Sequence, residues 1–180
     1  FDIALRLNDD KPVAWVQGSL LDGDDVIDND VLREDPTARG LIQFEDGVTV
    51  YVMQTARRTE VEAICEHGVV TSLAGKGWHV RSEGAPVSRG RPSLVPVEYP
   101  PHEDVSPTMR LIEDLAHSLD TGEPTRGGVR VARTNIGLIF GFIESHRRGG
   151  ARVRMPLEDA PLVLRRDRAP RQPTYEPVSG

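Results

Sequence analysis

Residues 40–53 read Gly-Leu-Ile-Gln-Phe-Glu-Asp-Gly-Val-Thr-Val-Tyr-Val-Met, two runs of β-forming residues with an Asp-Gly pair between them. Such a pair is a strong signal for a β-hairpin, and we expect Asp46 and Gly47 both to take the positive φ of a two-residue turn. In the second run every other residue from Val48 is a valine, which places the valines on one face of a strand. The stretch therefore predicts an antiparallel hairpin with one apolar face.

Further short strands are expected on both sides of this hairpin. The ranges richest in β-forming residues are 13–20, 61–65, 69–73, 78–81 and 93–99. Turns as short as His67-Gly68 join antiparallel strands. Pro96 places the last range at an edge or a bulge, because proline has no N–H to donate to a neighbouring strand. Residues 21–38 and 83–92 show no period, and we expect each to be a loop.

The pattern becomes helical after residue 105. Ser106-Pro107 is a favourable helix start and Gly122 a favourable end, and a second helix is expected from about Val129 to Arg148. The expected apolar stripes are Leu111, Ile112, Leu115 and Leu119 in the first helix, and Ala132, Ile136, Ile139, Phe140 and Ile143 in the second. Residues 151–155 alternate and predict a closing strand. Strands followed by helices indicate an α+β fold, an open and predominantly antiparallel sheet with helices packed on one face.

The composition predicts a soluble globular domain, and with a single cysteine we expect a reducing, cytoplasmic location. The chain has 180 residues, of which 38% are hydrophobic and 28% charged, and no apolar run approaches the roughly 20 residues that span a bilayer. No signal peptide is recognised at the start. Cys65 is the only cysteine, which excludes an intrachain disulfide and a cysteine-based zinc site.

Charge is unevenly distributed along the chain, whose net charge is −6. Acidic residues crowd the range 22–35, and arginines crowd the range 147–171. A basic end can indicate nucleic-acid binding. Here no aromatic residues are interleaved with the arginines and the chain as a whole is acidic, so we expect a solvated surface or an ion-pair region and no nucleic-acid partner.

Three stretches, in this order and spacing, resemble the C-terminal domain of the Gfo/Idh/MocA oxidoreductases. They are residues 1–16 with the helix start at Asp2 and the Pro12-Val13 turn, residues 40–68 with the hairpins, and residues 111–157, which contain the Thr121-Gly122-Glu123-Pro124 turn and the closing Pro156-Leu157. The resemblance implies a substrate-binding and oligomerisation domain over residues 1–158, with an open sheet of the dihydrodipicolinate-reductase-like type. Residues 159–180 are expected to form an Arg/Pro-rich tail.

The same resemblance implies a preceding dinucleotide-binding domain of Rossmann type. The 180 residues contain no G-x-G-x-x-G sequence, so NAD or NADP is expected to bind mainly to that other domain. Because the chain opens at Phe1 inside an apolar pattern, we interpret its start as a truncation.

The resemblance also implies candidate site residues. Asp2 matches the aspartate that contacts substrate or orients the catalytic base, and it is the candidate catalytic residue. Many members have a histidine four residues later, where this chain has Arg6. Arginine stays protonated and cannot be a general base, but it could bind an anionic substrate. His102 lies in an expected loop between sheet and helices, and is the other candidate substrate-binding residue.

Other polar residues are interpreted structurally. Arg126 and Arg130, at the start of the second expected helix, are best explained as members of ion pairs. None of the five histidines pairs with a carboxylate at metal-ligand spacing, so no metal is expected.

Three functions remain open on the sequence. The first is the substrate-side domain of an NAD(P)-dependent oxidoreductase that acts on a sugar-like or polyhydroxylated small molecule, inactive without its other domain. The others are a non-catalytic oligomerisation or scaffold module and a stand-alone ligand-binding domain. A homo-oligomer is expected through an apolar sheet face formed by Trp15, Val50, Val52 and Trp78.

Overall fold

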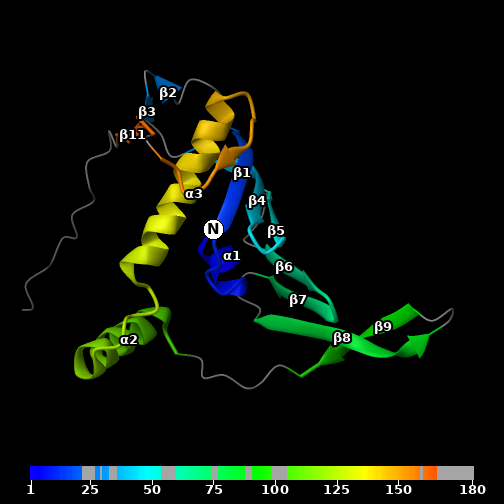
Figure 1. The fold of residues 1–180 in the computed structure, drawn as a ribbon. Helices are drawn as coiled ribbons and strands as arrows, with labels where there is room; N and C mark the ends of the chain where they lie inside the picture. The colour runs from blue at the N-terminus through cyan, green and yellow to red at the C-terminus, as the bar shows by residue number, and fades with distance from the viewer. Residues whose placement is uncertain are drawn as a thin grey trace, which may run out of the picture. The chain divides into compact units, whose positions relative to one another are not determined.

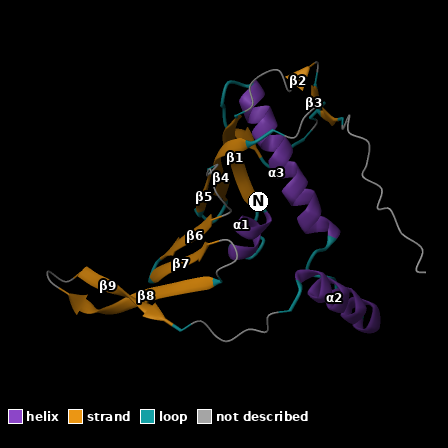
Figure 2. Ribbon diagram, turned by 180° about the vertical axis from the view of Figure 1, so that it is seen from behind, coloured by secondary structure: helices purple, strands orange, loops and turns teal. Residues whose placement is uncertain are grey.

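The computed structural model describes residues 1–21, 27–28, 30–32, 36–53, 60–73, 77–87, 91–98, 105–158 and 160–165. It is an α+β fold with mostly antiparallel open sheets (Figures 1 and 2). The helices are α1 (Asp2–Leu7), α2 (Pro107–Thr121) and α3 (Val129–Arg147). The strands are β1 (Val13–Leu20), β2 (Ile27–Asp28), β3 (Val31–Leu32), β4 (Ala38–Phe44), β5 (Thr49–Val52), β6 (Glu60–Cys65), β7 (Gly68–Leu73), β8 (Trp78–Val87), β9 (Arg91–Val97), β10 (Val153–Arg154) and β11 (Val163–Leu164).

The chain divides into two compact units. Unit 1 comprises Phe1, Lys11–Gln54 and Arg133–Gly180, and unit 2 comprises Asp2–Asp10 and Thr55–Ala132. Each unit has its own four-stranded antiparallel sheet, in the order β10-β1-β4-β5 in unit 1 and β6-β7-β8-β9 in unit 2. The units are therefore described one at a time.

The β4–β5 hairpin forms as expected in unit 1, but its turn differs from the predicted one. The loop has three residues, and of these only Gly47 has a positive φ, of 95°. The Gly47 N–H donates to the Phe44 carbonyl at 3.2 Å, and the Asp46 carboxylate accepts the Val48 N–H at 3.1 Å. The prediction of positive φ at Asp46 was wrong, because a three-residue loop closed by a glycine needs it only at the glycine.

Helix α3 covers one face of the unit 1 sheet, as both ribbon views show (Figures 1 and 2). Val16 and Ile42, which are cross-strand partners, are fully buried on that face, as are Leu138 and Phe142 of the helix. The ring of Phe1 stacks on that of Phe142, with centroids 5.0 Å apart. This helix-on-sheet layer contains most of the buried apolar side chains among the described residues.

Glycines allow the helix to approach the sheet closely. A methyl group at Gly18 would lie 2.3 Å from Cδ1 of Phe142, and one at Gly40 would lie 2.0 Å from the Gln17 carbonyl oxygen. On the helix side, a methyl group at Gly141 would lie 2.8 Å from Val16. Real Cβ atoms do not occupy such positions, so larger residues would push α3 away from β1 and β4.

A buried serine fixes the position of the helix along the sheet. Ser145, which is fully buried, accepts the Gly18 N–H at 2.9 Å and donates to the Ala151 carbonyl at 2.6 Å. One hydroxyl thus links β1, α3 and the segment leading to β10. Both of its bonds satisfy backbone groups that would otherwise need another partner.

The buried side of α3 is not the expected one. Of the predicted stripe only Ile143 is buried, whereas Ile136 is 54% and Ile139 42% exposed. The sheet instead contacts the side that carries Leu138, Gly141, Phe142 and Ser145. The predicted stripe omitted Leu138 and Phe142, because Ile136 and Ile139 form a second apolar row at helical spacing.

The expectation of a loop over residues 21–38 was wrong in part. The described residues there include β2 and β3, which form a small sheet with β11 from the start of the C-terminal tail, and β3 pairs with β11 in parallel. Leu20, Leu32 and Ile143, which belong to β1, β3 and α3, form a buried apolar cluster. Strands of two residues are too short to show the alternation of apolar and polar residues by which a strand is recognised in a sequence.

Residues 83–92 were also wrongly expected to be a loop. In unit 2 the described residues of this range, 83–87 and 91–92, belong to the paired strands β8 and β9, with a register shift between Glu83 and Pro86. Prolines and glycines at this bulge conceal the strands from a composition-based prediction. Pro96 lies on β9, which ends the strand order, so the predicted edge position is confirmed.

Helix α2 has the predicted limits. Pro107 opens the helix, although the Ser106 hydroxyl forms no capping bond, and Gly122 ends it with a φ of 77° and an N–H that donates to the Ser118 carbonyl. None of its residues is buried. The expected burial of its apolar stripe is therefore not found, and Leu119 is 78% exposed.

The glycine contacts predict opposite outcomes for two glycine-to-alanine changes. Gly18→Ala should lower the free energy of unfolding by about 1–3 kcal/mol, because the methyl group overlaps Phe142 and a backbone carbonyl. Gly137→Ala, inside α3 with an ordinary 3.5 Å contact to Met155, should raise it by about 0.5–1 kcal/mol. Urea unfolding of both variants measures this, and equal effects would contradict the packing described.

Candidate functional site

Asp2, the candidate catalytic residue, begins α1 and is accessible. The helix has six residues, of which only Leu5 is buried. The Asp2 side chain is 59% exposed, and its Oδ1 lies 4.0 Å from the Nε of Arg6. The carboxylate is therefore open on most sides to a hydrogen-bond donor from solution.

Arg6 lies at the centre of a group that we name the α1 charge cluster, consisting of Asp2, Arg6, Asp10, Asp114 and Arg126. Its Nη1 donates to Oδ2 of Asp10 at 2.7 Å. Its Nη2 donates to the backbone carbonyl of Arg126. The guanidinium thus contacts two carboxylates of its own helix region and one carbonyl more than a hundred residues away in sequence.

The backbone of Arg126 is held on both sides. Its carbonyl accepts from Arg6, and its N–H donates to Oδ2 of Asp114 at 2.9 Å. Asp114 lies on α2 with a side chain 21% exposed, and its Oδ1 is 4.0 Å from Nε of Arg126. The ion pair predicted for Arg126 is present at this distance, and the Arg126 side chain as a whole is 91% exposed.

Sequence reasoning missed two members of the cluster. Asp10 stands four residues after Arg6, a spacing that brings side chains together on a helix, so it could have been noticed. Asp114 had no such signal, because its partner Arg126 is twelve residues away across the end of a helix. Only the tertiary structure brings them together.

The other predicted site residue, His102, lies outside the described residues. Three other histidines have structural surroundings. His67 is 3.4 Å from Glu83, and His117 is 3.2 Å from Glu123, both at the surface. Nδ1 of His146 accepts the Leu20 N–H at 3.3 Å. Within the described part of the chain, no three His, Cys, Asp or Glu side chains come together as a group that could hold a metal ion.

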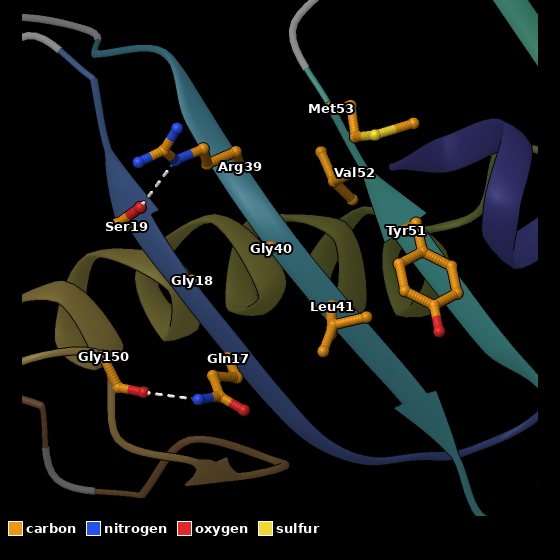
Figure 3. Close-up of a pocket in the computed structure, with 10 residues that line it drawn as sticks. All are labelled: Gln17, Gly18, Ser19, Arg39, Gly40, Leu41, Tyr51, Val52, Met53 and Gly150. Carbon is orange, nitrogen blue, oxygen red and sulfur yellow. Dashed lines mark hydrogen bonds between the residues drawn. The ribbon is translucent and has the colours of Figure 1, made fainter.

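A shallow depression of about 440 Å³ lies on the face of the unit 1 sheet opposite α3 (Figure 3). We name this surface the open face. Its lining side chains come from alternate positions of β1, β4 and β5 and from the residue after β5, and they include Gln17, Ser19, Arg39, Leu41, Tyr51 and Met53. Figure 3 shows α3 behind the strands, with Arg39 and Tyr51 on the near side.

Polar groups on the open face bond to one another. Nε2 of Gln17 donates to the Gly150 carbonyl at 2.8 Å, and Nε of Arg39 donates to the Ser19 hydroxyl at 3.2 Å. Tyr51 is 71% and Met53 74% exposed. The depression is thus a surface of mixed character that lies open to solvent, unlike the enclosed clefts that hold small substrates.

The apolar residues of this face differ from those expected. Val50 and Val52 pair with Ile42 and Gly40, so they lie on the side that α3 covers. Trp78 belongs to the sheet of unit 2. Of the four predicted residues only Trp15 is on the open face, where Arg152 lies 4.3 Å above its ring. The expected face thus combined Val50 and Val52, which lie on the α3 side, with Trp15 of the open face and Trp78 of the other sheet.

No described feature of the chain fits a dinucleotide. Binding of a pyrophosphate in a Rossmann domain needs a glycine-rich turn between a strand and a helix. The strands from β1 to β8 are each followed by another strand, and the only long helices follow β9 and α2.

None of the described helices is long and apolar enough to cross a membrane.

Comparison with known proteins found no matching family model, no matching curated protein and no matching solved structure.

Proposed function

We propose that this chain is the substrate-side domain of an NAD(P)-dependent oxidoreductase of the Gfo/Idh/MocA type, acting on a sugar-like or polyhydroxylated small molecule. The observation that carries the proposal is the Asp2 carboxylate, exposed at the start of α1 in the position that the sequence resemblance gives to the family's substrate-contacting aspartate. The mostly antiparallel sheet with α3 on one face is compatible with the dihydrodipicolinate-reductase-like domain.

The role of Asp2 follows from its chemistry. A carboxylate accepts hydrogen bonds and donates none, so it selects a substrate hydroxyl and fixes the direction of its O–H bond. Orienting the hydroxyl whose carbon loses hydride helps the removal of its proton. Arg6 cannot accept that proton, so the base belongs to another residue, for which the sequence resemblance implies a lysine of the other domain.

The nicotinamide cofactor accepts or supplies the hydride and is held outside these 180 residues in this proposal. This division agrees with the absence of a glycine-rich dinucleotide turn from the sequence. This chain contributes the groups that bind and orient the substrate.

Asp2→Asn tests the proposed role in the protein encoded by the natural gene. Across a panel of polyols and sugars with NAD⁺ or NADP⁺, formation of reduced nicotinamide should identify a substrate, and Asp2→Asn should lower kcat/KM by roughly a hundredfold or more. Asp9→Asn is the matched control, because Asp9 is an exposed neighbour whose φ of 55° asparagine also tolerates. Equal kinetics for Asp2→Asn and the wild type would refute the role.

A second prediction concerns residues 1–180 alone. Titration with NADH or NADPH, followed by nicotinamide fluorescence, should show no binding, because the sequence has no glycine-rich dinucleotide turn. Saturable binding at micromolar concentrations would contradict the two-domain account.

Self-association through the open face is a second proposed role, favoured by the exposure of Tyr51 and Met53 beside Leu41. Aromatic residues and methionine are enriched in protein interfaces. The role is compatible with catalysis, and it would be the main function if the chain were a scaffold module.

Tyr51→Glu tests this second role. If copies pair through the open face, the variant should raise the dimer dissociation constant at least about tenfold, because charging a central tyrosine costs on the order of 2 kcal/mol. Sedimentation velocity over a concentration series measures the constant. Leu115→Glu, at an exposed position of α2, is the control. A larger effect of Leu115→Glu than of Tyr51→Glu would assign association to α2 instead.

A further inference from the structure

We propose that Arg6 is a positioning residue, which holds the Asp2 end of α1 against the backbone of the α2–α3 connection and does not itself bind substrate. The inference rests on the proposed function, because it concerns the same site. It replaces the role of anion binder that the sequence suggested for this arginine.

The Arg6 guanidinium already has partners within the chain. Recognition of a carboxylate or phosphate by arginine uses two parallel N–H groups on one edge of the guanidinium. In Arg6, Nη1 donates to Asp10 at 2.7 Å and Nη2 donates to the Arg126 carbonyl. Nε faces Asp2 at 4.0 Å. Both terminal nitrogens are thus engaged by groups of the chain, and the third faces a carboxylate, so an anionic substrate would meet a guanidinium that is already paired.

Acidic side chains lie next to Arg6. Asp2 and Asp10 both lie within 4.0 Å of the Arg6 guanidinium. Two carboxylates of the same short segment thus face one guanidinium. An anion approaching this segment is repelled, whereas a neutral hydroxyl group can donate to Asp2 without a charge penalty. The surroundings of Arg6 therefore favour a neutral substrate group.

Arg6 connects α1 to the segment between α2 and α3. The Arg126 peptide accepts from Arg6 through its carbonyl and donates to Asp114 through its N–H. Gly128 and Val129 follow, where α3 begins. One arginine thus joins α1, the α2–α3 connection and, through Asp114, helix α2. Lysine cannot replace it fully, because one ammonium group lacks the planar fork that reaches Asp10 and the carbonyl together.

The test uses Arg6→Gln and Arg6→Lys in the protein from the natural gene, with Arg81→Gln on β8 as the charge-matched control. Amide hydrogen exchange reports on the hydrogen bond between Arg6 and the α2–α3 connection. Exchange in residues 124–131 should be faster in both Arg6 variants, because the Arg126 carbonyl loses its partner, and unchanged in Arg81→Gln. Unchanged exchange in both Arg6 variants would overturn the proposal, whether or not turnover is detected.

Kinetics separates positioning from substrate binding and from a merely structural role. A positioning residue predicts a kcat reduced about tenfold to a hundredfold, a substrate KM within about twofold of wild type, and partial recovery in Arg6→Lys. A raised KM with unchanged kcat would assign Arg6 to substrate binding, and faster exchange with unchanged kcat would make it structural only; either result overturns the proposal. Failure of the proposed function is recognised separately, by the absence of turnover in the wild type and every variant.

Discussion

The close contact between α3 and the β1–β4 strands is the constraint on which the structure of unit 1 depends. Glycine at positions 18, 40 and 141 removes the side chains that would keep the two layers apart, and Phe142 fills the space that the sheet glycines leave. Ser145 then fixes where along β1 the helix lies, because its hydroxyl must meet the Gly18 N–H. A buried N–H without a partner costs about 1–3 kcal/mol, so this bond specifies the register as well as contributing stability.

Unit 2 is held together differently. The described part of its sheet contributes none of the buried core residues, and α2 has none either. Its α1 charge cluster is exposed, and exposed ion pairs contribute only about 0–1 kcal/mol each. The cluster therefore matters for geometry and not for stability. Through Arg6 it links the Asp2 carboxylate to the backbone of the α2–α3 connection, and the proposed orientation of a substrate hydroxyl would use such an arrangement.

The sequence predicts those parts of the fold that local residues determine, and it predicts tertiary contacts less well. The β4–β5 hairpin and the limits of α2 were predictable, because Asp-Gly, proline and the C-terminal glycine act locally. The buried side of α3 was predicted wrongly: Leu138 and Phe142 lie four residues apart on it, but Ile136 and Ile139 form a competing apolar row, and Gly141 and Ser145 add no hydrophobic signal. At the candidate site, Asp2 and Arg6 were found from the resemblance. The contacts that give Arg6 its new interpretation involve Asp114 and the Arg126 carbonyl, which only the fold brings near.

The central claim is that the domain presents a hydroxylated substrate to a nicotinamide held elsewhere in the same protein. Isotope transfer tests it most directly. The protein from the natural gene would be incubated with reduced nicotinamide deuterated on the transferring ring carbon and with the oxidised forms of candidate polyols. Mass spectrometry should find one deuterium on the carbon that becomes the alcohol carbon of the product. Full consumption of the substrate with no deuterium in any product would contradict the account.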